Sequence, residues 1–257
     1  MKKLLILSTL LFCLTFACNA DQWVQVEYFG HACFRLTLSD GYQIVIDPFD
    51  TERFQYTLPQ AANLVLMTHG HSDHSNWKPF KDAAVYMACG EDEKFIEYSP
   101  EGEKKPAAGP LKPAQDVIVR TVPSFHDEVH GEKRGCNGII IVETQGMQFV
   151  HLGDIGTTLT EKQITAIGKP DVLMVPVGGK YTVAIAGAYT ISEQLQPWLV
   201  IPMHFHTSKL PTGLNLQEPD DFYDKFDQIK IIRDWNFLVT PLNLPEEMTI
   251  VKMNYHP

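Results

Sequence analysis

The segment at residues 68–74 constrains this chain of 257 residues more than any other part of it. Its sequence is Thr-His-Gly-His-Ser-Asp-His, and it follows an apolar run at 63–67 with the pattern of a strand buried on both faces. Divalent zinc, manganese and iron accept imidazole nitrogen and carboxylate oxygen as ligands. In a tight turn the first two histidines can point to one side while the aspartate and the last histidine reach the other, which suits two adjacent metal ions. The alternative is a polar turn with surface histidines, which we disfavour because so dense a cluster is costly to hold without a purpose.

Short strand-like runs alternate with helical stretches along the chain. Strands are predicted at residues 24–29, 33–38, 43–46, 63–67, 117–122, 138–143, 147–152, 172–175 and 199–202, with hairpin turns at 39–41 and 145–146. Helices are predicted at 92–98, 160–168, 184–195 and 220–228, with Thr160 and Asp220 as N-caps. Residues 99–115 are rich in Pro, Gly and Lys and are predicted to form an exposed loop. Because strands and helices alternate in both halves, we expect one α/β domain over residues 21–257, with helices on the outer faces of its sheets.

Residues 1–20 have the composition of a secretory signal peptide. A basic start at 1–3 precedes an apolar run at 4–17, which is too short to span a bilayer comfortably, and small residues follow before Asp21. The mature protein is therefore expected to be extracytoplasmic, either periplasmic or secreted. Cys18 leaves an alternative open: as the acylated cysteine of a lipoprotein leader, it would anchor the protein to a membrane.

The charge of the mature chain limits its partners. Removal of residues 1–20 leaves 19 basic residues against 31 acidic ones, a net charge of −12. Because affinity for phosphate backbones depends on clustered Lys and Arg, we expect no nucleic-acid partner. A small-molecule substrate is expected instead, either neutral or an anion held by a local cationic site such as a metal. The sequence carries no signal for an oligomeric state.

The cysteines give no disulfide pattern. After removal of the leader, Cys33, Cys89 and Cys136 remain, an odd number without metal-type spacing. We therefore expect no disulfide scaffold.

A family resemblance rests on the histidine motif. The pattern His-x-His-x-Asp-His after a hydrophobic strand is the signature of the metallo-β-lactamase fold hydrolases, and residues 69–74 resemble it. Ser75 and Asn76 stand where a glycine is usual, a departure that affects loop shape more than ligation. The resemblance covers nearly the whole mature chain, and it implies a four-layer αββα sandwich of two central mixed sheets flanked by helices.

The resemblance also implies a complete ligand set for two metals. The later ligands have candidates in the expected order, each just after a predicted strand: His126, Asp154 and His204. The first metal would be held by His69, His71 and His126. The second would be held by Asp73, His74 and His204. Asp154 would bridge the two.

The remaining histidines are not assigned as ligands. His151 is expected to be a core histidine or a support for the ligands. His130 and His206 could either line a cleft or be merely exposed. His31 belongs to a Gly-His pair that resembles one subgroup of the fold, and we expect it to face the site without binding metal.

Three further segments resemble the subgroup that contains L-ascorbate-6-phosphate lactonase and, more distantly, N-acyl-phosphatidylethanolamine phospholipase D. They are residues 46–48, His126 followed by 134–137, and residues 176–182.

Candidate substrate-binding residues lie in these segments. Arg134 is the best candidate for an anion clamp, because a planar guanidinium can grip a phosphate or carboxylate through two hydrogen bonds. Lys180 and Tyr181 could polarise a substrate oxygen or be a solvated surface pair, and Gly179 could admit a substrate or form an ordinary turn. Asp47 could support the histidine ligands from behind.

The function implied by the resemblance is a secreted, dinuclear metal-dependent hydrolase. Two divalent ions, Zn²⁺ foremost with Mn²⁺ and Fe²⁺ as alternatives, would share a hydroxide, because metal binding lowers the pKa of water from about 15.7 toward roughly 7. That metal-bound hydroxide would attack an ester, lactone or phosphodiester bond. Asp73 and Asp154 are the candidate catalytic residues, which could orient the nucleophile or carry a proton.

Other functions are less favoured. A non-catalytic metal- or ligand-binding protein on the same fold is the main alternative, and redox chemistry at the metals is another. Seven candidate ligands weigh against a structural site, because closed structural sites use four. Zinc β-lactamases with a cysteine ligand would need Cys at Asp154, and diiron flavoproteins would need Glu at His71.

Overall fold

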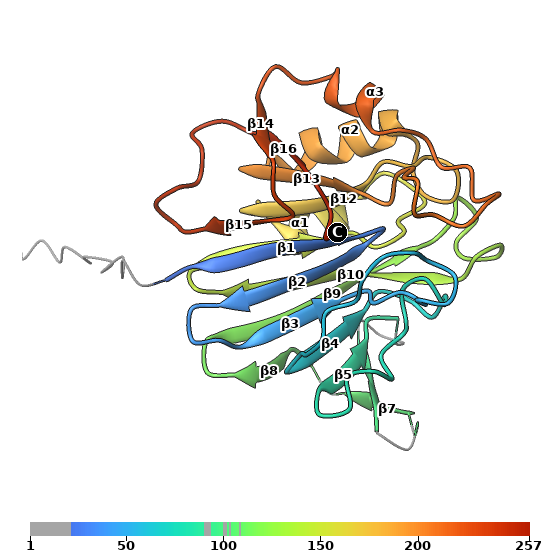
Figure 1. Ribbon diagram of the computed structural model, residues 1–257, viewed down its shortest axis with the longest axis vertical. Coiled ribbons are helices and arrows are strands. Elements are labelled where there is room, and N and C mark those ends of the chain that lie inside the picture. The colour runs from blue at the N-terminus through green and yellow to red at the C-terminus, as the bar shows by residue number, and fades with distance from the viewer. Residues whose placement is uncertain (1–21, 90–93, 100–101, 103, 108) are drawn as a thin grey trace, which may run out of the picture.

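Two eight-stranded mixed sheets form the body of the protein (Figure 1). The computed structural model describes residues 22–89, 94–99, 102, 104–107 and 109–257, so the predicted signal peptide at 1–20 lies outside the described residues. Among the residues described, there is no helix with the length and apolar character needed to cross a membrane. The two mixed sheets confirm the predicted α/β sandwich.

The first sheet combines antiparallel edges with a parallel centre. Its strand order is β15 (Asn236–Val239), β1 (Val24–Gly30), β2 (Cys33–Leu38), β3 (Gln43–Ile46), β4 (Leu64–Met67), β5 (Ala84–Met87), β6 (Phe95–Tyr98) and β7 (Lys104–Ala107). Strands β3, β4 and β5 run parallel to one another, and the other pairs are antiparallel.

The second sheet is arranged in the same way. Its strand order is β14 (Ile229–Ile232), β16 (Thr249–Met253), β13 (Leu199–Met203), β12 (Val172–Pro176), β11 (Met147–His151), β10 (Cys136–Thr144), β9 (Val117–Phe125) and β8 (Leu111–Ala114). The neighbouring strands β14, β16, β13, β12 and β11 run parallel to one another. The neighbouring strands β11, β10, β9 and β8 pair antiparallel.

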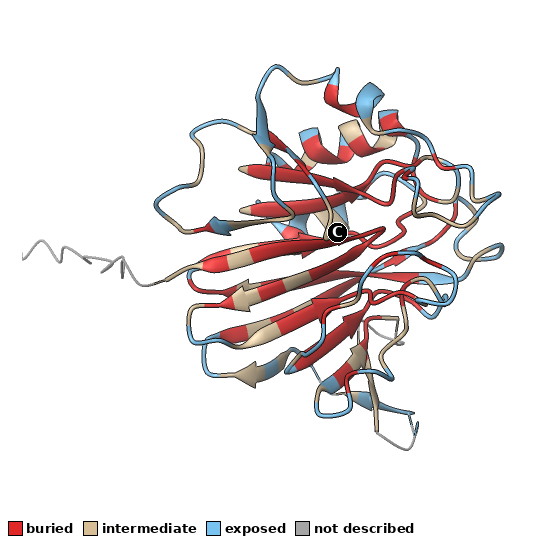
Figure 2. Cartoon of the chain, in the orientation of Figure 1, coloured by how far each residue is buried: buried red, intermediate tan, exposed pale blue. Residues whose placement is uncertain are grey.

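The main core lies between the two sheets. Strand side chains alternate between faces, so Ile44 and Ile46 of β3 join this core while Val45 faces the other way. The central strands of both sheets are buried along most of their length (Figure 2). Continuous burial explains why these strands have uninterrupted apolar sequences.

Helices cover only the second sheet in the part of the chain that the structure describes. Helix α1 (Glu161–Ile167) packs on β9, α2 (Ile185–Leu195) packs on β12, and α3 (Asp220–Tyr223) packs on α2 (Figure 1). The outer face of the first sheet is covered instead by loops that carry Phe49, Phe54, Tyr56 and Phe80. The expectation of helices on both outer faces is therefore wrong for the first sheet.

Most predicted elements are present, and the errors concentrate at sheet edges. The helix predicted at 92–98 is wrong, because Phe95–Tyr98 form β6; residues 92 and 93 lie outside the described residues. The loop predicted at 99–115 contains β7 and β8. Helix α1 has the predicted cap, with Thr160 and Gln163 in a reciprocal capping box. Helix α3 is shorter than predicted and is capped by Pro219 rather than Asp220.

The structure adds a disulfide that the cysteine count did not predict. Cys89, which follows β5, is bonded to Cys136, the first residue of β10, with Cα atoms 5.9 Å apart. A Cβ on Gly138 would collide with the Ala88 carbonyl, which shows that the start of β10 lies directly against the end of β5. The bond thus links the two sheets, and Cys33 is left as a buried free thiol.

Candidate metal centre

The predicted ligands come together because each one follows the end of a strand. Residues 68–74 follow β4, His126 follows β9, and His204 follows β13, while Asp154 comes three residues after β11. The carboxyl ends of strands meet along one edge of a sheet, where α/β proteins build their sites. The two sheets bring their edges together, so residues far apart in sequence form one cluster.

The first predicted metal site is assembled. His69, His71 and His126 offer ligand atoms that all lie within 4.8 Å of one another. The His69 Nε2 and His71 Nδ1 atoms are 3.0 Å apart. His69 and His126 are buried, while His71 is exposed to solvent. This group can therefore take a metal that remains accessible from outside.

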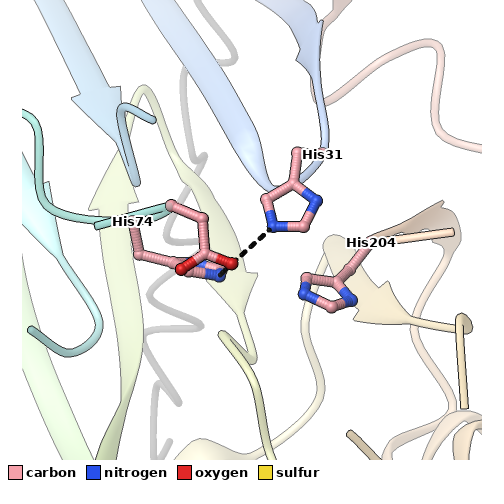
Figure 3. A group of neighbouring side chains, drawn as sticks. His31, His74 and His204 are labelled. Atoms are coloured by element: carbon pink, nitrogen blue, oxygen red, sulfur yellow. Dashed lines mark hydrogen bonds and ion pairs between the residues drawn. The ribbon is translucent and has the colours of Figure 1, made fainter. Parts of the chain in front are cut away.

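The structure also brings together the residues predicted for the second metal, and one further histidine lies with them. Asp73, His74 and His204 lie within the same 4.8 Å limit, and His31 joins them. The His31 Nε2 atom is 3.2 Å from Asp73 Oδ2, and its ring centroid is 4.2 Å from that of His204. The rings of His31, His74 and His204 converge on a common space (Figure 3). His31, which was expected to face the site without binding metal, thus lies in a group where it can also offer a ligand atom.

Asp154 lies at the junction of the two groups. Its Oδ2 atom is 3.0 Å from His126 Nε2, 3.2 Å from His204 Nε2 and 3.3 Å from His74 Nε2. The first of these histidines belongs to one group and the other two belong to the second. A carboxylate in this position is close enough to both groups to contact a cation in either one; the bridging role itself stays a prediction.

The cluster has the unmet bonding capacity that a cation would satisfy. Among the described residues, seven buried side-chain polar atoms have no hydrogen-bond partner, and five of them belong to this cluster. They are His31 Nδ1, His74 Nε2, His126 Nδ1, His204 Nδ1 and Asp154 Oδ1. Buried polar atoms are rarely left unsatisfied, so the free His74 Nε2, which lies 3.3 Å from Asp154 Oδ2, fits a centre that holds metal; the three Nδ1 atoms belong to rings whose Nε2 atoms face the cluster.

The electrostatics also favour ligand-competent side chains. Burial, reinforced by the neighbouring His74, lowers the pKa of His69 well below its usual value. Burial alone would raise the pKa of Asp154, but His204 and His74 outweigh it and hold that pKa well below its usual range. Neutral imidazoles and ionised carboxylates are the forms that bind metal. The pKa of His74 shifts in the other direction from that of His69. Burial alone would lower it, but the nearby carboxylates, led by Asp154, raise it well above its usual value. The surroundings of His74 therefore favour positive charge.

Asp47 lies behind the cluster and contacts one of its histidines, where a support for the ligands was predicted. It is fully buried and lies 2.8 Å from His74 Nδ1 through Oδ2. Its carboxylate also accepts hydrogen bonds from the backbone N–H and the hydroxyl of Thr68, each at 2.7 Å. His151 lies behind this network, with Nε2 2.9 Å from the carbonyl oxygen of Ala32, so it is a core histidine and not part of any ligand group. A carboxylate that fixes a ligand histidine is a common feature of metal sites.

Asn137 positions Asp154, a role that the sequence did not assign. Its Oδ1 atom accepts the backbone N–H of Asp154 at 2.9 Å, and its Nδ2 donates to the Leu152 carbonyl and to Ser124 Oγ. Gly153 has φ +56°, and a Cβ there would collide with Asn137 Oδ1. The available signal was a polar residue directly before the apolar residues 138–142 of β10.

A cavity of 330 Å³ opens onto the cluster. It is lined by the metal-site residues His71, Asp73, His126, Asp154 and His204, together with Arg53, Ser72, Arg134, Tyr181 and Leu214. Arg134 and Tyr181 therefore lie where substrate-binding residues were predicted. Arg53 was not predicted.

Gly179 and Lys180 lie beside this cavity and do not line it. The absent side chain of Gly179 leaves room for Gln217, and Lys180 is exposed, with Nζ 5.3 Å from the Tyr181 ring centroid. Their substrate-binding role stays a prediction. His130 lines a different cavity beside Phe125, and His206 is exposed, 3.7 Å from Glu218.

Two facing mixed sheets with such a cluster at their strand ends define a class, the metal-dependent hydrolases of the metallo-β-lactamase fold. The family model of the beta-lactamase superfamily domain matches residues 25–204. The chain belongs to this family.

Relatives extend the similarity over most of the chain. A UPF0173 metal-dependent hydrolase of Methanosphaera stadtmanae is 30% identical over 204 residues, which cover 72% of this chain and 85% of that protein. A crystal structure of a metallo-beta-lactamase superfamily protein from Thermotoga maritima is 29% identical with a TM-score of 0.65, covering 91% of this chain and 100% of that one. A metallo hydrolase from Ignicoccus hospitalis, 22% identical with a TM-score of 0.61, covers 91% and 95% and shares the fold.

Proposed function

We propose that this protein is a secreted hydrolase that uses two divalent metal ions to cleave an ester, lactone or phosphodiester bond in a small molecule. Zn²⁺ is the first candidate, with Mn²⁺ and Fe²⁺ as alternatives, because all three accept the same ligands. The observation that carries the proposal is the position of Asp154, whose Oδ2 atom lies within 3.3 Å of imidazoles from both ligand groups. A centre for a single ion would not need a carboxylate between two groups.

Different residues of the chain have different roles at the proposed centre. When bound, divalent cations lower the pKa of water and withdraw charge from a carbonyl or phosphoryl oxygen. His69, His71 and His126 would hold one ion and Asp73, His74 and His204 the other, with Asp154 between them. Asp154 is buried, whereas the Asp73 side chain is 22% exposed and lines the cavity. Asp154 is therefore placed to hold cations, and Asp73, which also offers a ligand atom, is placed to orient water.

Burial alone would raise the pKa of Asp73, but the neighbouring His74 and His31 hold it well below its usual range. This carboxyl is therefore ionised at neutral pH and can accept a hydrogen bond from water or a substrate hydroxyl.

Location outside the cytoplasm is part of the proposal. Residues 1–20 have the composition of a leader, and lipidation at Cys18 remains the alternative route to the same side of the membrane. The disulfide between Cys89 and Cys136 supports this location, because structural disulfides persist mainly in oxidising compartments. The acidic net charge supports a small-molecule substrate over a nucleic acid.

The proposal is tested by metal content and hydrolysis measured on the same preparations. We expect about two equivalents of metal per chain by mass spectrometry, and cleavage of 4-nitrophenyl acetate or bis(4-nitrophenyl) phosphate that stops on chelation. Asp154→Ala should lose both ions and activity, whereas Asp171→Ala, which removes a half-buried carboxylate outside the ligand groups, should lose neither. Metal-loaded protein that cleaves neither compound would favour the binding-protein alternative.

A further inference from the structure

Arg53 and Arg134 line the same cavity, and neither has a carboxylate partner among the described residues. The chain has five arginines. Arg35 and Arg120 form ion pairs with glutamates, but Arg53 and Arg134 have no carboxylate partner among the described residues, and both line the cavity over the metal cluster. In an acidic protein, available carboxylates are plentiful, so two arginines left without a carboxylate partner at one cavity over a cluster that can hold metal are placed to receive an anion.

Arg53 is attached to the loop that carries the metal ligands. Its Nη1 atom donates to Ser72 Oγ at 3.1 Å, and the backbone N–H of Asp50 donates to the Ser72 carbonyl at 3.1 Å. The next residue, Phe54, is buried with its ring centroid 4.9 Å from that of His31. The turn that bears Arg53 is therefore fixed to the centre at both ends.

Arg134 comes from the second sheet and is fixed independently. The Asp127 carboxylate accepts four backbone N–H groups, including that of Arg134 at 2.7 Å, and so holds the loop after His126 in a closed shape. The Arg134 guanidinium lies 5.7 Å from the Tyr181 ring centroid. The loop between β9 and β10 thus presents one arginine, and the loop between β3 and β4 presents the other.

We infer that Arg53 and Arg134 form a two-sided subsite for an oxyanion, so that the substrate carries a carboxylate or phosphate group separate from the bond that is cleaved. This inference rests on the proposed hydrolase function, because it assigns the substrate class of the same cavity. The metal cluster would engage the scissile group, while the arginines engage the second anionic group from two walls. A planar guanidinium binds either oxyanion through paired hydrogen bonds.

The test compares two esters that differ in charge. We propose 4-nitrophenyl acetate as the neutral ester and mono-4-nitrophenyl succinate as the anionic one, with Arg53→Gln, Arg134→Gln and the double variant. Each single variant should lower kcat/KM for the anionic ester about 10- to 100-fold and change it less than about threefold for the neutral ester. Arg233→Gln is the matched control, because Arg233 has no carboxylate partner in the described structure and lines a different cavity.

A binding measurement separates this inference from the hydrolase proposal. Succinate is titrated calorimetrically into metal-loaded and metal-stripped protein. If wild type cleaves neither ester, the hydrolase proposal fails, and the subsite is still supported when the double variant, but not Arg233→Gln, weakens succinate binding more than tenfold. Succinate binding that the double variant leaves unchanged overturns the subsite. Equal losses on both esters in Arg53→Gln also overturn it, because they indicate damage to the metal centre instead.

Discussion

The Asp47 carboxylate determines which ring nitrogen of His74 faces the metal cluster. It lies 2.8 Å from His74 Nδ1, and a carboxylate can only accept, so Nδ1 must carry the proton. That leaves His74 Nε2, which is 3.3 Å from Asp154, as the free electron pair for a metal. In Asp47→Asn the amide oxygen can still accept the hydrogen bond from the Thr68 backbone N–H. The amide NH₂ then lies against His74 Nδ1 and donates to it. The proton then moves to Nε2, the wrong nitrogen for ligation.

The magnitude follows from the hydrogen bond that is lost. A hydrogen bond to a charged group contributes about 1.5–3 kcal/mol, and each 1.4 kcal/mol is about a tenfold change in affinity. Asp47→Asn should therefore weaken metal binding roughly 10- to 100-fold, the range typical of residues that orient metal ligands. Competition with a chromophoric chelator at pH 7.5 measures the affinity, and near-UV circular dichroism checks that the variant is folded.

The matched control is Asp171→Asn. Asp171 is a half-buried carboxylate that accepts a backbone N–H from Gln148 at 2.7 Å and contacts no cluster residue. Its metal affinity should stay within about threefold of wild type. A folded Asp47→Asn variant with equally unchanged affinity would refute the role assigned to this carboxylate.

Three further predictions concern the supports of the site. Replacing Cys89 and Cys136 by serine should lower the free energy of unfolding by about 2–4 kcal/mol, because the bond closes a 47-residue separation; a urea midpoint insensitive to reductant in wild type would contradict this. Gly153→Ala should lower the free energy of unfolding in urea by about 1–3 kcal/mol and reduce metal content, because its Cβ would collide with Asn137 and displace Asp154; a normal metal content would argue against that placement. Burial lowers the pKa of His151, whereas the unfolded chain takes up this proton near pH 6.5, so stability should fall as pH drops below 6.5, and less so in His151→Gln; equal losses in both proteins would show that other groups are responsible.

The interior of the fold was predictable because buried strands carry a strong pattern. Strands such as β4 and β13 are apolar at every position, and burial on both faces is the physical cause. Strands β6, β7 and β8 lie toward the sheet edges and are largely exposed or half-buried, with Lys and Pro in β7 and β8. Edge strands use such residues to prevent pairing with other chains, so their sequences resemble loops.

The ligand set was predictable for a different reason. Each ligand follows an apolar strand, and the motif at 69–74 indicates the chemistry directly. Arg53 and Asn137 carry no such signal, because their roles depend on contacts with residues distant in sequence. Arg53 reaches the cavity through Ser72, and Asn137 reaches Asp154 through a hydrogen bond between neighbouring strand ends. Only the closure of the two sheets creates those contacts.

Three residues of the centre have backbone conformations that non-glycine residues rarely adopt. His31, Asp47 and His204 have φ values of 53°, 50° and 53°, and each directly follows a strand. The left-handed conformation costs about 1–2 kcal/mol per residue, and the surrounding hydrogen bonds offset it. The His204 N–H donates to the His31 carbonyl at 2.7 Å, and the Asp47 N–H donates to the Leu66 carbonyl at 2.9 Å. Backbone hydrogen bonds between strand ends therefore help to hold these turns, and each turn carries a buried side chain of the cluster or of the network behind it.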